Sequence, residues 1–178
     1  MSLLVNMGLC HMVIGKPHYL SFYTQQSFIF TIHNGKTDLS ALVLAIYAFI
    51  KAGDEHYEQA VEAADQALAI METYPNCREA SNILNIIAVG VLHYQKPLHQ
   101  VRELHQQGYQ RGLLSGEIMR AVINLGNELH LQFCQGDKLQ KLKKAAEQVV
   151  NIAESHKQFY PVALFWLRFS KSLLRRDV

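Results

Sequence analysis

The sequence predicts an all-α fold, a right-handed α-α superhelix of about nine antiparallel helices. Three observations lead to this prediction. Apolar residues recur at helical spacing from Leu3 to Leu174. Glycine, proline and asparagine fall between these stretches, at intervals expected of helix ends. Several landmark residues then recur in the same order after about eighty residues, which is typical of a repeat protein.

The composition fits one globular domain and argues against several functional classes. The chain has 178 residues, of which 49% are apolar, enough for a continuous core. A net charge of +2 gives no strong attraction to nucleic acid, which we do not expect as a partner. Cys10, Cys77 and Cys134 are too widely spaced to predict a disulfide framework or a metal site. With no secretory signal pattern and no apolar run long enough for a bilayer, we expect a cytoplasmic protein without membrane segments.

Four helices are predicted in the first half of the chain. The first covers residues 3–14, and the second covers residues 19–33 and ends at Asn34-Gly35, a pair suited to a helix C-terminus. Residues 27–33 also alternate like a strand, but no second strand is available to pair with them, which favours a helix. The third helix covers residues 39–52, with Thr37 or Asp38 as its N-cap, and the fourth covers residues 55–73.

Five helices are predicted in the remainder. Asn76, with Glu79 three residues later, forms an asparagine variant of the capping box and starts a fifth helix that reaches about Tyr94. The sixth helix begins near Pro97 and runs to residue 114. The last three cover residues 117–134, 138–156 and 159–174, with Pro161 in the first turn of the ninth, where proline is tolerated.

Landmark pairs in the first half recur in the second. Each pair is followed here by its counterpart: Lys16-Pro17 and Lys96-Pro97, Gly35 and Gly116, Gly53-Asp54 and Gly136-Asp137, Tyr74-Pro75 and Tyr160-Pro161. The offsets drift from 80 to 86 residues, as small loop insertions would produce. We therefore predict one domain over residues 1–178, with four-helix units at about 1–76 and 77–161 and a final helix at 159–175. Because no polar cap is visible at either end, we expect the chain to be a piece of a longer protein.

Small residues mark the helix faces predicted to approach each other. Ala60, Ala64 and Ala67, at spacings of four and three, share one side of the fourth helix and allow a neighbouring helix to lie close. Gly53-Asp54 precedes this helix. We expect the glycine to supply a positive φ angle and the aspartate to cap the next helix, here and at Gly136-Asp137.

In these features the chain resembles the tetratricopeptide repeat, which has a Gly-Asp turn, two alanines seven residues apart on its second helix and a later proline. Gly53-Asp54, Ala60, Ala67 and Pro75 match that pattern in kind. Ala60 lies farther from the turn, and Pro75 later, than the thirty-four-residue period requires. The resemblance therefore implies a divergent, tetratricopeptide-like solenoid with longer helices.

A narrower resemblance covers most of residues 40–139. Its features are Lys96-Pro97-Leu98, the turn formed by Gly112-Leu113 and Ser115-Gly116-Glu117, and the later Gly136-Asp137. This segment is similar to the helical region of large bacterial signalling ATPases, which also carry kinase-like and histidine-kinase domains. The resemblance implies a non-catalytic regulatory or protein-interaction segment of a signal-transduction or transcription-regulating ATPase or kinase. A stand-alone adaptor that binds a peptide or partner protein is the alternative.

Signatures of catalysis are missing from the sequence. It contains no P-loop, no kinase loop, no phosphoacceptor-histidine motif and no two histidines three or four residues apart. We therefore expect no enzymatic activity, cofactor or metal within these residues. A histidine-dependent enzyme with an inter-helix pocket stays as a third hypothesis, to be supported by histidines and carboxylates that converge in one pocket.

Two surface-like groups favour ordinary structural roles. Lysines at 138, 141, 143 and 144, and the cations Arg168, Lys171, Arg175 and Arg176, lack interleaved aromatic residues, which favours solvated helix faces over phosphate binding. The second helix carries five aromatic residues, for which we predict burial between helices. They are Tyr19, Phe22, Tyr23, Phe28 and Phe30.

Polar side chains inside otherwise apolar helices are the candidate partner-binding residues. They are Asn82 and Asn85 in the fifth helix and Asn124, Asn127 and Glu128 in the seventh. In a solenoid of this type the first helix of each hairpin lines the concave surface, where amides can bind a peptide backbone. The same amides could instead bridge neighbouring helices, and the sequence leaves both possibilities open.

Overall fold

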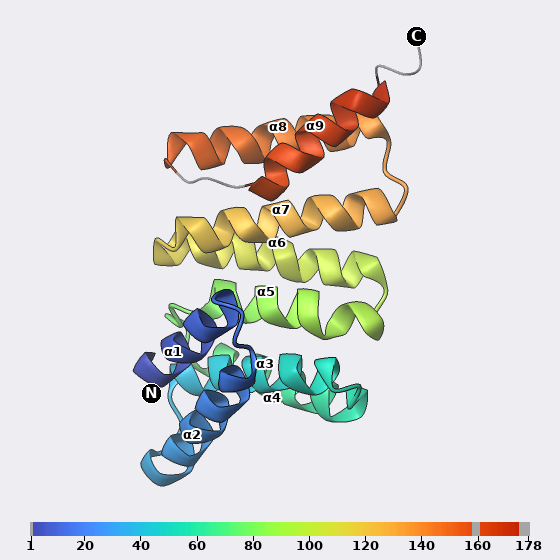
Figure 1. Ribbon diagram of the computed structural model, residues 1–178. Coiled ribbons are helices and arrows are strands. Elements are labelled where there is room, and N and C mark those ends of the chain that lie inside the picture. Colours follow the sequence, from blue (N-terminus) through green and yellow to red (C-terminus); the bar gives the residue numbers. More distant parts are fainter. Residues whose placement is uncertain (1, 158–160, 175–178) are drawn as a thin grey trace.

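A computed structural model describes residues 2–157 and 161–174, and within these ranges every regular element is helical (Figure 1). The elements in chain order are α1 (Ser2–Val13), α2 (His18–Asn34), α3 (Asp38–Gly53), α4 (Tyr57–Thr73), α5 (Ala80–Gly90), the short 3₁₀ helix η1 (Leu92–Tyr94), α6 (Leu98–Ser115), α7 (Ile118–Cys134), α8 (Leu139–Ser155) and α9 (Pro161–Leu174). The all-α prediction is confirmed, and α2 is one continuous helix where a strand was the alternative. None of the described helices is long and apolar enough to cross a membrane.

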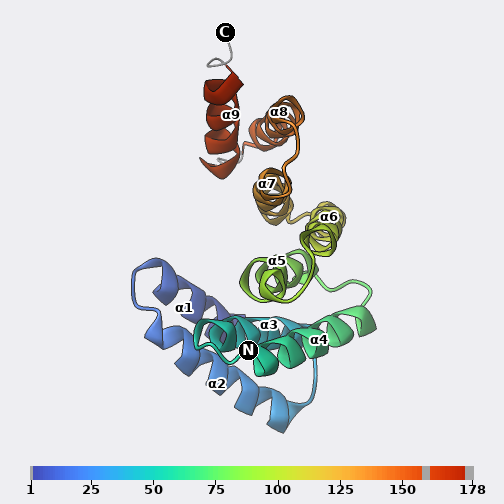
Figure 2. The same cartoon turned by 90° about the vertical axis from the view of Figure 1, so that its right-hand side faces the viewer.

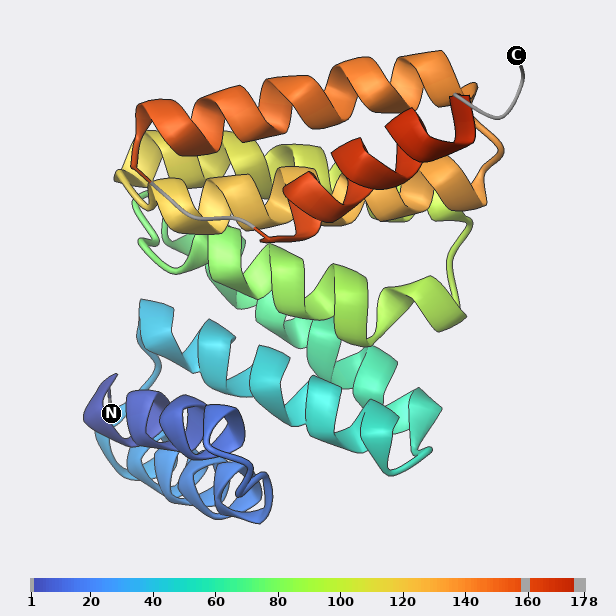
Figure 3. The ribbon, with the colours of Figure 1, turned by 45° about the horizontal axis from the view of Figure 1, so that its top comes forward.

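Helices stack along the chain so that each packs on its sequence neighbours. Further contacts join alternate helices, α3 to α5, α5 to α7 and α7 to α9. Figure 2 looks nearly down the axes of α5 to α8 and shows these helices stepping from side to side in a zigzag. In Figure 3 the α1–α2 pair lies at the end of the stack opposite α8 and α9. The odd-numbered helices from α3 to α9 therefore form one row, and α4, α6 and α8 flank it.

Two apolar cores occupy the two ends of this stack. The larger is built mainly from α3, α4 and α5, and the smaller from α7, α8 and α9 around Leu129, Leu142 and Trp166. Between them, buried apolar residues are few, and Ala88, Val101 and Leu131 form a small third cluster. The contact of α5, α6 and α7 holds most of the buried polar side chains among the described residues, namely Ser81, Asn82, His105, Asn124, Glu128 and Gln132.

The small residues of α4 have the predicted role. Ala60, Ala64 and Ala67 are completely buried where α4 packs against α3. Because none of them projects beyond a methyl group, the two helices lie close along their length.

The two Gly-Asp turns differ in detail. Gly136 has φ +77°, and the Asp137 N–H donates to the carbonyl of Gln132, which closes α7. At the first turn α3 stays helical through Gly53, so the reversal falls on Glu55, with φ +63°. The prediction of positive φ is confirmed for Gly136 and wrong for Gly53.

Neither aspartate of these turns caps the next helix, so that prediction is also wrong. The N-cap of α4 is His56 and that of α8 is Lys138. The Asp137 carboxylate instead accepts a hydrogen bond from Lys141 Nζ at 3.0 Å. At α3, by contrast, Thr37 is the N-cap as predicted, and its N–H donates to Ser40 Oγ at 3.0 Å.

Helix α5 is shorter than predicted at both ends. The capping box at Asn76 does not form, because the residues before α5 make turns in which the Cys77 N–H donates to the Tyr74 carbonyl. At the other end, α5 stops at Gly90, and η1 covers the last predicted turn. Gly90 lies against the Phe49 ring so closely that an added Cβ would overlap the ring.

The aromatic residues of α2 are more exposed than predicted. Tyr19, Phe22 and Phe30 expose 39%, 51% and 44% of their surface, so burial between helices is wrong for these three. Tyr23 and Phe28 are half-buried. The reason is that α2 contacts only α1 and α3 to any extent among the described helices, which leaves much of its circumference uncovered.

Candidate functional site

Asn124 is the centre of a polar network that joins α5, α6 and α7. It has no exposed surface. Its Nδ2 donates to the Ser81 carbonyl at 3.0 Å, to Ser81 Oγ at 3.2 Å and to the Arg120 carbonyl at 3.0 Å. Its Oδ1 lies 3.0 Å from Nδ1 of His105. One side chain thus links three helices and has its donors and its acceptor engaged.

Two glycines let α6 approach this network. A Cβ added at Gly108 would lie 2.5 Å from Asn124 Oδ1, and one at Gly112 would lie 2.9 Å from the Ala121 backbone nitrogen. Any side chain at either position would push α6 away or displace the Asn124 amide. Gly112 and Gly108 are therefore required by close packing, and both are buried.

The network also fixes the protonation of His105. Backbone carbonyls can only accept, so the amide nitrogen of Asn124 must face Ser81 and Arg120 and its oxygen must face His105. His105 Nδ1 is therefore the donor. Burial lowers the pKa of His105, although its hydrogen bond to Asn124 works in the opposite direction. The ring is neutral at pH 7, with the proton on Nδ1 and a free lone pair on Nε2.

The other predicted amides are also paired between helices. Arg120 donates to Asn82 Oδ1 at 2.6 Å, and Asn127 Nδ2 donates to Asn85 Oδ1 at 2.7 Å. Asn82 exposes 3% of its surface, and Asn85 and Asn127 are half-buried. The geometry is that of the alternative interpretation, in which these amides bridge neighbouring helices. Asn82 and Asn124 have almost no surface with which to contact a partner.

Glu128 is the centre of a second polar cluster, which lies between α6 and α7. Its Oε1 accepts from Arg102 at 3.2 Å, from Gln106 at 3.0 Å and from Gln132 at 3.4 Å, whereas its Oε2 accepts no hydrogen bond from the described residues. Arg102 also approaches Asp137 at 3.7 Å. The exposed fractions of the Arg102 and Glu128 side chains, 21% and 9%, make this a largely buried ion pair.

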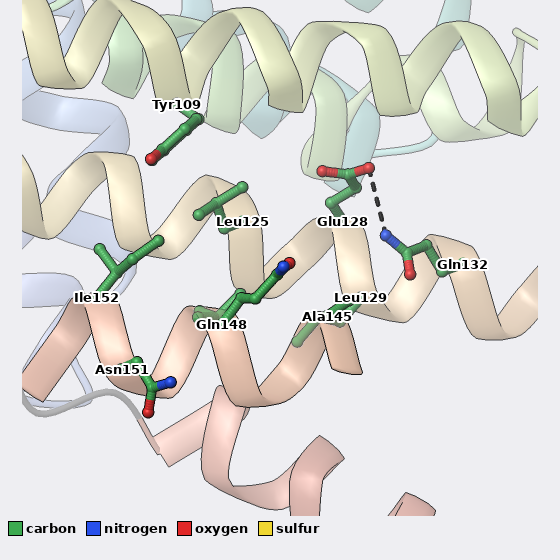
Figure 4. A pocket seen from close by; sticks show the side chains of 10 residues that line it. Tyr109, Leu125, Glu128, Leu129, Gln132, Ala145, Gln148, Asn151 and Ile152 are labelled. Atoms are coloured by element: carbon green, nitrogen blue, oxygen red, sulfur yellow. Dashed lines mark hydrogen bonds between the residues drawn. The ribbon is translucent and has the colours of Figure 1, made fainter. Parts of the chain in front are cut away.

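A groove of about 590 Å³ opens beside Glu128 (Figure 4). We call it the α6–α8 groove, because α7 forms its floor and side chains of α6 and α8 form its walls. Its lining residues are Tyr109, Leu125, Glu128, Leu129, Gln132, Ala145, Gln148, Val149, Asn151 and Ile152. In Figure 4 the Gln132 amide nitrogen points to Glu128 and its oxygen points away. This oxygen is buried and has no hydrogen-bond partner in the part of the chain that the structure describes.

The groove continues into a hollow of about 520 Å³ that carries lysines. The two share Gln132, Ala145 and Gln148, and the second adds Lys138, Lys141 and Lys144. Three of the four lysines at 138, 141, 143 and 144 therefore line one end of the groove. Lys141 pairs with Asp137, whereas Lys144 makes no ion pair with a described residue. Of the cations predicted on α9, Arg175 and Arg176 lie outside the described residues.

A second groove, of about 420 Å³, lies between α2 and α4 over α3. We call it the α2–α4 groove. Five of its lining residues have a counterpart 81 or 82 positions later in the α6–α8 groove. The pairs are Phe28 and Tyr109, Leu44 and Leu125, Tyr47 and Glu128, Ala63 and Ala145, Gln66 and Gln148. The chemistry of the two grooves differs. The Tyr47 ring packs edge-on against the Phe28 ring, with 5.2 Å between ring centroids, and Lys51 Nζ lies over the Tyr47 ring. Its counterpart Glu128 instead forms an ion pair with Arg102.

The histidines do not assemble a metal site. No group of three His, Cys, Asp or Glu residues in the described parts of the chain could hold a metal ion. His93, His105 and His130 line one pocket between α5 and α7, and its lining contains no carboxylate. The acid–base pairing that the enzyme hypothesis requires is thus not found among these lining residues.

Sequence reasoning missed the partners of the predicted residues. Gln132 lies one helical turn after Glu128 on the same apolar helix, so the same polar pattern could have included it. Ser81 and His105 give no such signal, because they reach Asn124 from other helices and no local spacing relates them.

No protein-family model, curated protein or solved structure matches the chain.

Proposed function

We propose that this chain is a non-catalytic helical-repeat scaffold that binds a protein or peptide partner in the α6–α8 groove. The observation that carries the proposal is the Gln132 amide oxygen, which is buried at the groove and lacks a partner. An unsatisfied buried carbonyl costs about 1–3 kcal/mol, which an N–H group of a bound chain would offset once the Gln132 side chain turns its oxygen toward the groove.

The rest of the groove defines the kind of peptide that fits. Leu125 and Leu129 on the floor and Val149 in the wall offer an apolar lining for one anchoring side chain. At the adjoining end Lys138 and Lys144 favour an acidic flank. The partner is therefore a segment with an apolar anchor, followed or preceded by acidic residues, and its backbone or an amide donates to Gln132.

Recurrence of the groove positions supports a repeat architecture. Five pairs of lining residues at separations of 81 and 82 fit four-helix units of about eighty residues that stack as a right-handed, tetratricopeptide-like solenoid. In such a stack each unit presents an equivalent groove. Because Glu128 stands in the α6–α8 groove where the α2–α4 groove has Tyr47, the two grooves differ in specificity.

In its biological setting the scaffold is a regulatory segment of a bacterial signal-transduction ATPase or kinase, a proposal supported by the resemblance over residues 40–139. Occupancy of the groove would bias the attached module by favouring one arrangement of the helices. The alternative is a stand-alone adaptor. An antibody against this segment distinguishes the two in a lysate of the source organism, because the adaptor migrates near 20.3 kDa and the ATPase far above it.

Site-specific cross-linking tests the groove. A photo-reactive amino acid at Gln148, in the groove wall, should capture a partner, whereas one at Glu154, exposed on the same helix outside the groove, should not. The captured protein is identified, purified and titrated against the scaffold. Equal capture at both positions, or capture at Glu154 alone, would refute the assignment of this groove.

A further inference from the structure

A separate pocket is bounded by α5, η1, α6 and α7, and it shares no lining residue with the α6–α8 groove. Its volume is about 410 Å³, within the range of about 300–1,000 Å³ that small-molecule sites occupy. Val89, Val101 and Leu131 contribute to a mostly apolar lining. No carboxylate, lysine or arginine lines it, so a charged ligand would find no counter-charge.

The polar side chains of this pocket are the imidazoles of His93, His105 and His130 and the amide of Asn127, which is hydrogen-bonded to Asn85. His105 exposes 1% of its surface, and its Nε2 has no hydrogen-bond partner among the described residues, since its only bond is from Nδ1 to Asn124. His93 Nδ1 is buried and also lacks a hydrogen-bond partner in the described ranges. Burial lowers the pKa of both rings, so both are neutral near pH 7. The Nε2 lone pair of His105 is therefore a hydrogen-bond acceptor inside an apolar pocket.

We propose that this pocket binds a small uncharged molecule with an aromatic-sized apolar body and one hydroxyl or N–H group that donates to His105 Nε2. The apolar lining favours the body of the ligand, and the neutral imidazole selects the donor. This site is distinct from the α6–α8 groove, because the two share no lining residue and are lined by different residues of α7.

Phenol, benzene and anisole test the donor requirement. Benzene and anisole bracket phenol in size and lack its O–H group, so phenol should bind about five-fold tighter than either, as one net hydrogen bond predicts. Binding is followed by calorimetry and by the ¹⁵N resonances of the histidine side chains. Before ligand is added, His105 should show the Nδ1–H tautomer, and phenol alone should then shift its Nε2 resonance.

Two variants locate the binding. Val89→Trp, at the partly exposed rim of the pocket, should abolish phenol binding, and Met119→Trp, on an exposed position of α7 outside the pocket, should not. His105→Phe removes the hydrogen-bond acceptor of the pocket, but it also removes the partner of Asn124. If this variant unfolds, the ¹⁵N measurement on the wild-type protein is the deciding test. Equal affinity for the three compounds, an unshifted Nε2 resonance, or unchanged binding by Val89→Trp would each overturn the proposal.

Discussion

Replacing Gly108 with alanine should destabilise the protein through Asn124. The new Cβ would lie 2.5 Å from Oδ1 and 2.6 Å from Cγ of Asn124, well inside van der Waals contact. The amide cannot move away without breaking bonds to Ser81 on α5 and His105 on α6. The substitution therefore acts on the contact of three helices, although it adds only one methyl group.

The size of this destabilisation follows from the Asn124 hydrogen bonds that the added methyl group would break. Leaving two buried partners unsatisfied costs about 2–6 kcal/mol, and alanine regains about 1 kcal/mol in helix propensity, so the net loss is about 1–5 kcal/mol. Gly53→Ala is the matched control, because Gly53 is the last residue of α3 and no atom lies within 4 Å of an added Cβ. This control should leave stability unchanged or raise it by up to about 1 kcal/mol.

Urea unfolding measures the difference in stability between Gly108→Ala and Gly53→Ala. Circular dichroism follows the helix content, and fluorescence of Trp166 follows the α7–α9 core. In an Asn124→Ala background the added methyl group has no amide to displace, so Gly108→Ala should lose most of its destabilising effect. The reasoning is refuted if Gly108→Ala is as stable as Gly53→Ala, or if its effect is the same with and without Asn124.

Three further predictions concern packing, charge and pH. Ala64→Leu should destabilise by about 1–3 kcal/mol through overpacking against α3, whereas Ala69→Leu, exposed on the same helix, should be nearly neutral in urea unfolding. Arg102→Ala should destabilise by about 1–3 kcal/mol, because it leaves a largely buried carboxylate unpaired, whereas Arg78→Ala removes an exposed pair and should leave the unfolding midpoint unchanged. Because the pKa of His105 lies below its ordinary 6.5 in the folded state, the unfolded chain takes up a proton first as pH falls. The free energy of unfolding should therefore drop as pH decreases below about 6.5, and less steeply in His105→Gln. An equally steep fall in the free energy of unfolding of the wild type and of His105→Gln would contradict this account.

The presence of the helices was predictable from the sequence, because the signals that form and end a helix lie in residues close together in the chain. Apolar periodicity and Gly or Pro punctuation indicated the helices, and Ala60, Ala64 and Ala67 predicted which face of α4 is buried. The errors arose where tertiary contacts decide. Gly90 ends α5 against the Phe49 ring, which no residue near Gly90 in sequence reveals.

The candidate site was predictable in residue type and not in role. Asn82, Asn124 and Glu128 stood out as polar residues in apolar helices, and each is hydrogen-bonded to a side chain or carbonyl of another helix. Their partners come from positions up to 43 residues away, so pairing depends on how α5, α6 and α7 stack. The grooves arise from that same stacking, and the sequence pattern contains no sign of the unpaired Gln132 oxygen.

The affinity of the captured partner for the α6–α8 groove tests the central claim most directly. Lys144→Glu reverses a charge at the acidic-binding end of the groove, and Lys171→Glu makes the same change on an exposed position of α9. Calorimetric titration of the purified partner should show binding weakened about ten-fold by Lys144→Glu, equivalent to about 1.4 kcal/mol, and unchanged by Lys171→Glu. Equal affinity of both variants and the wild type would contradict the groove as the binding surface.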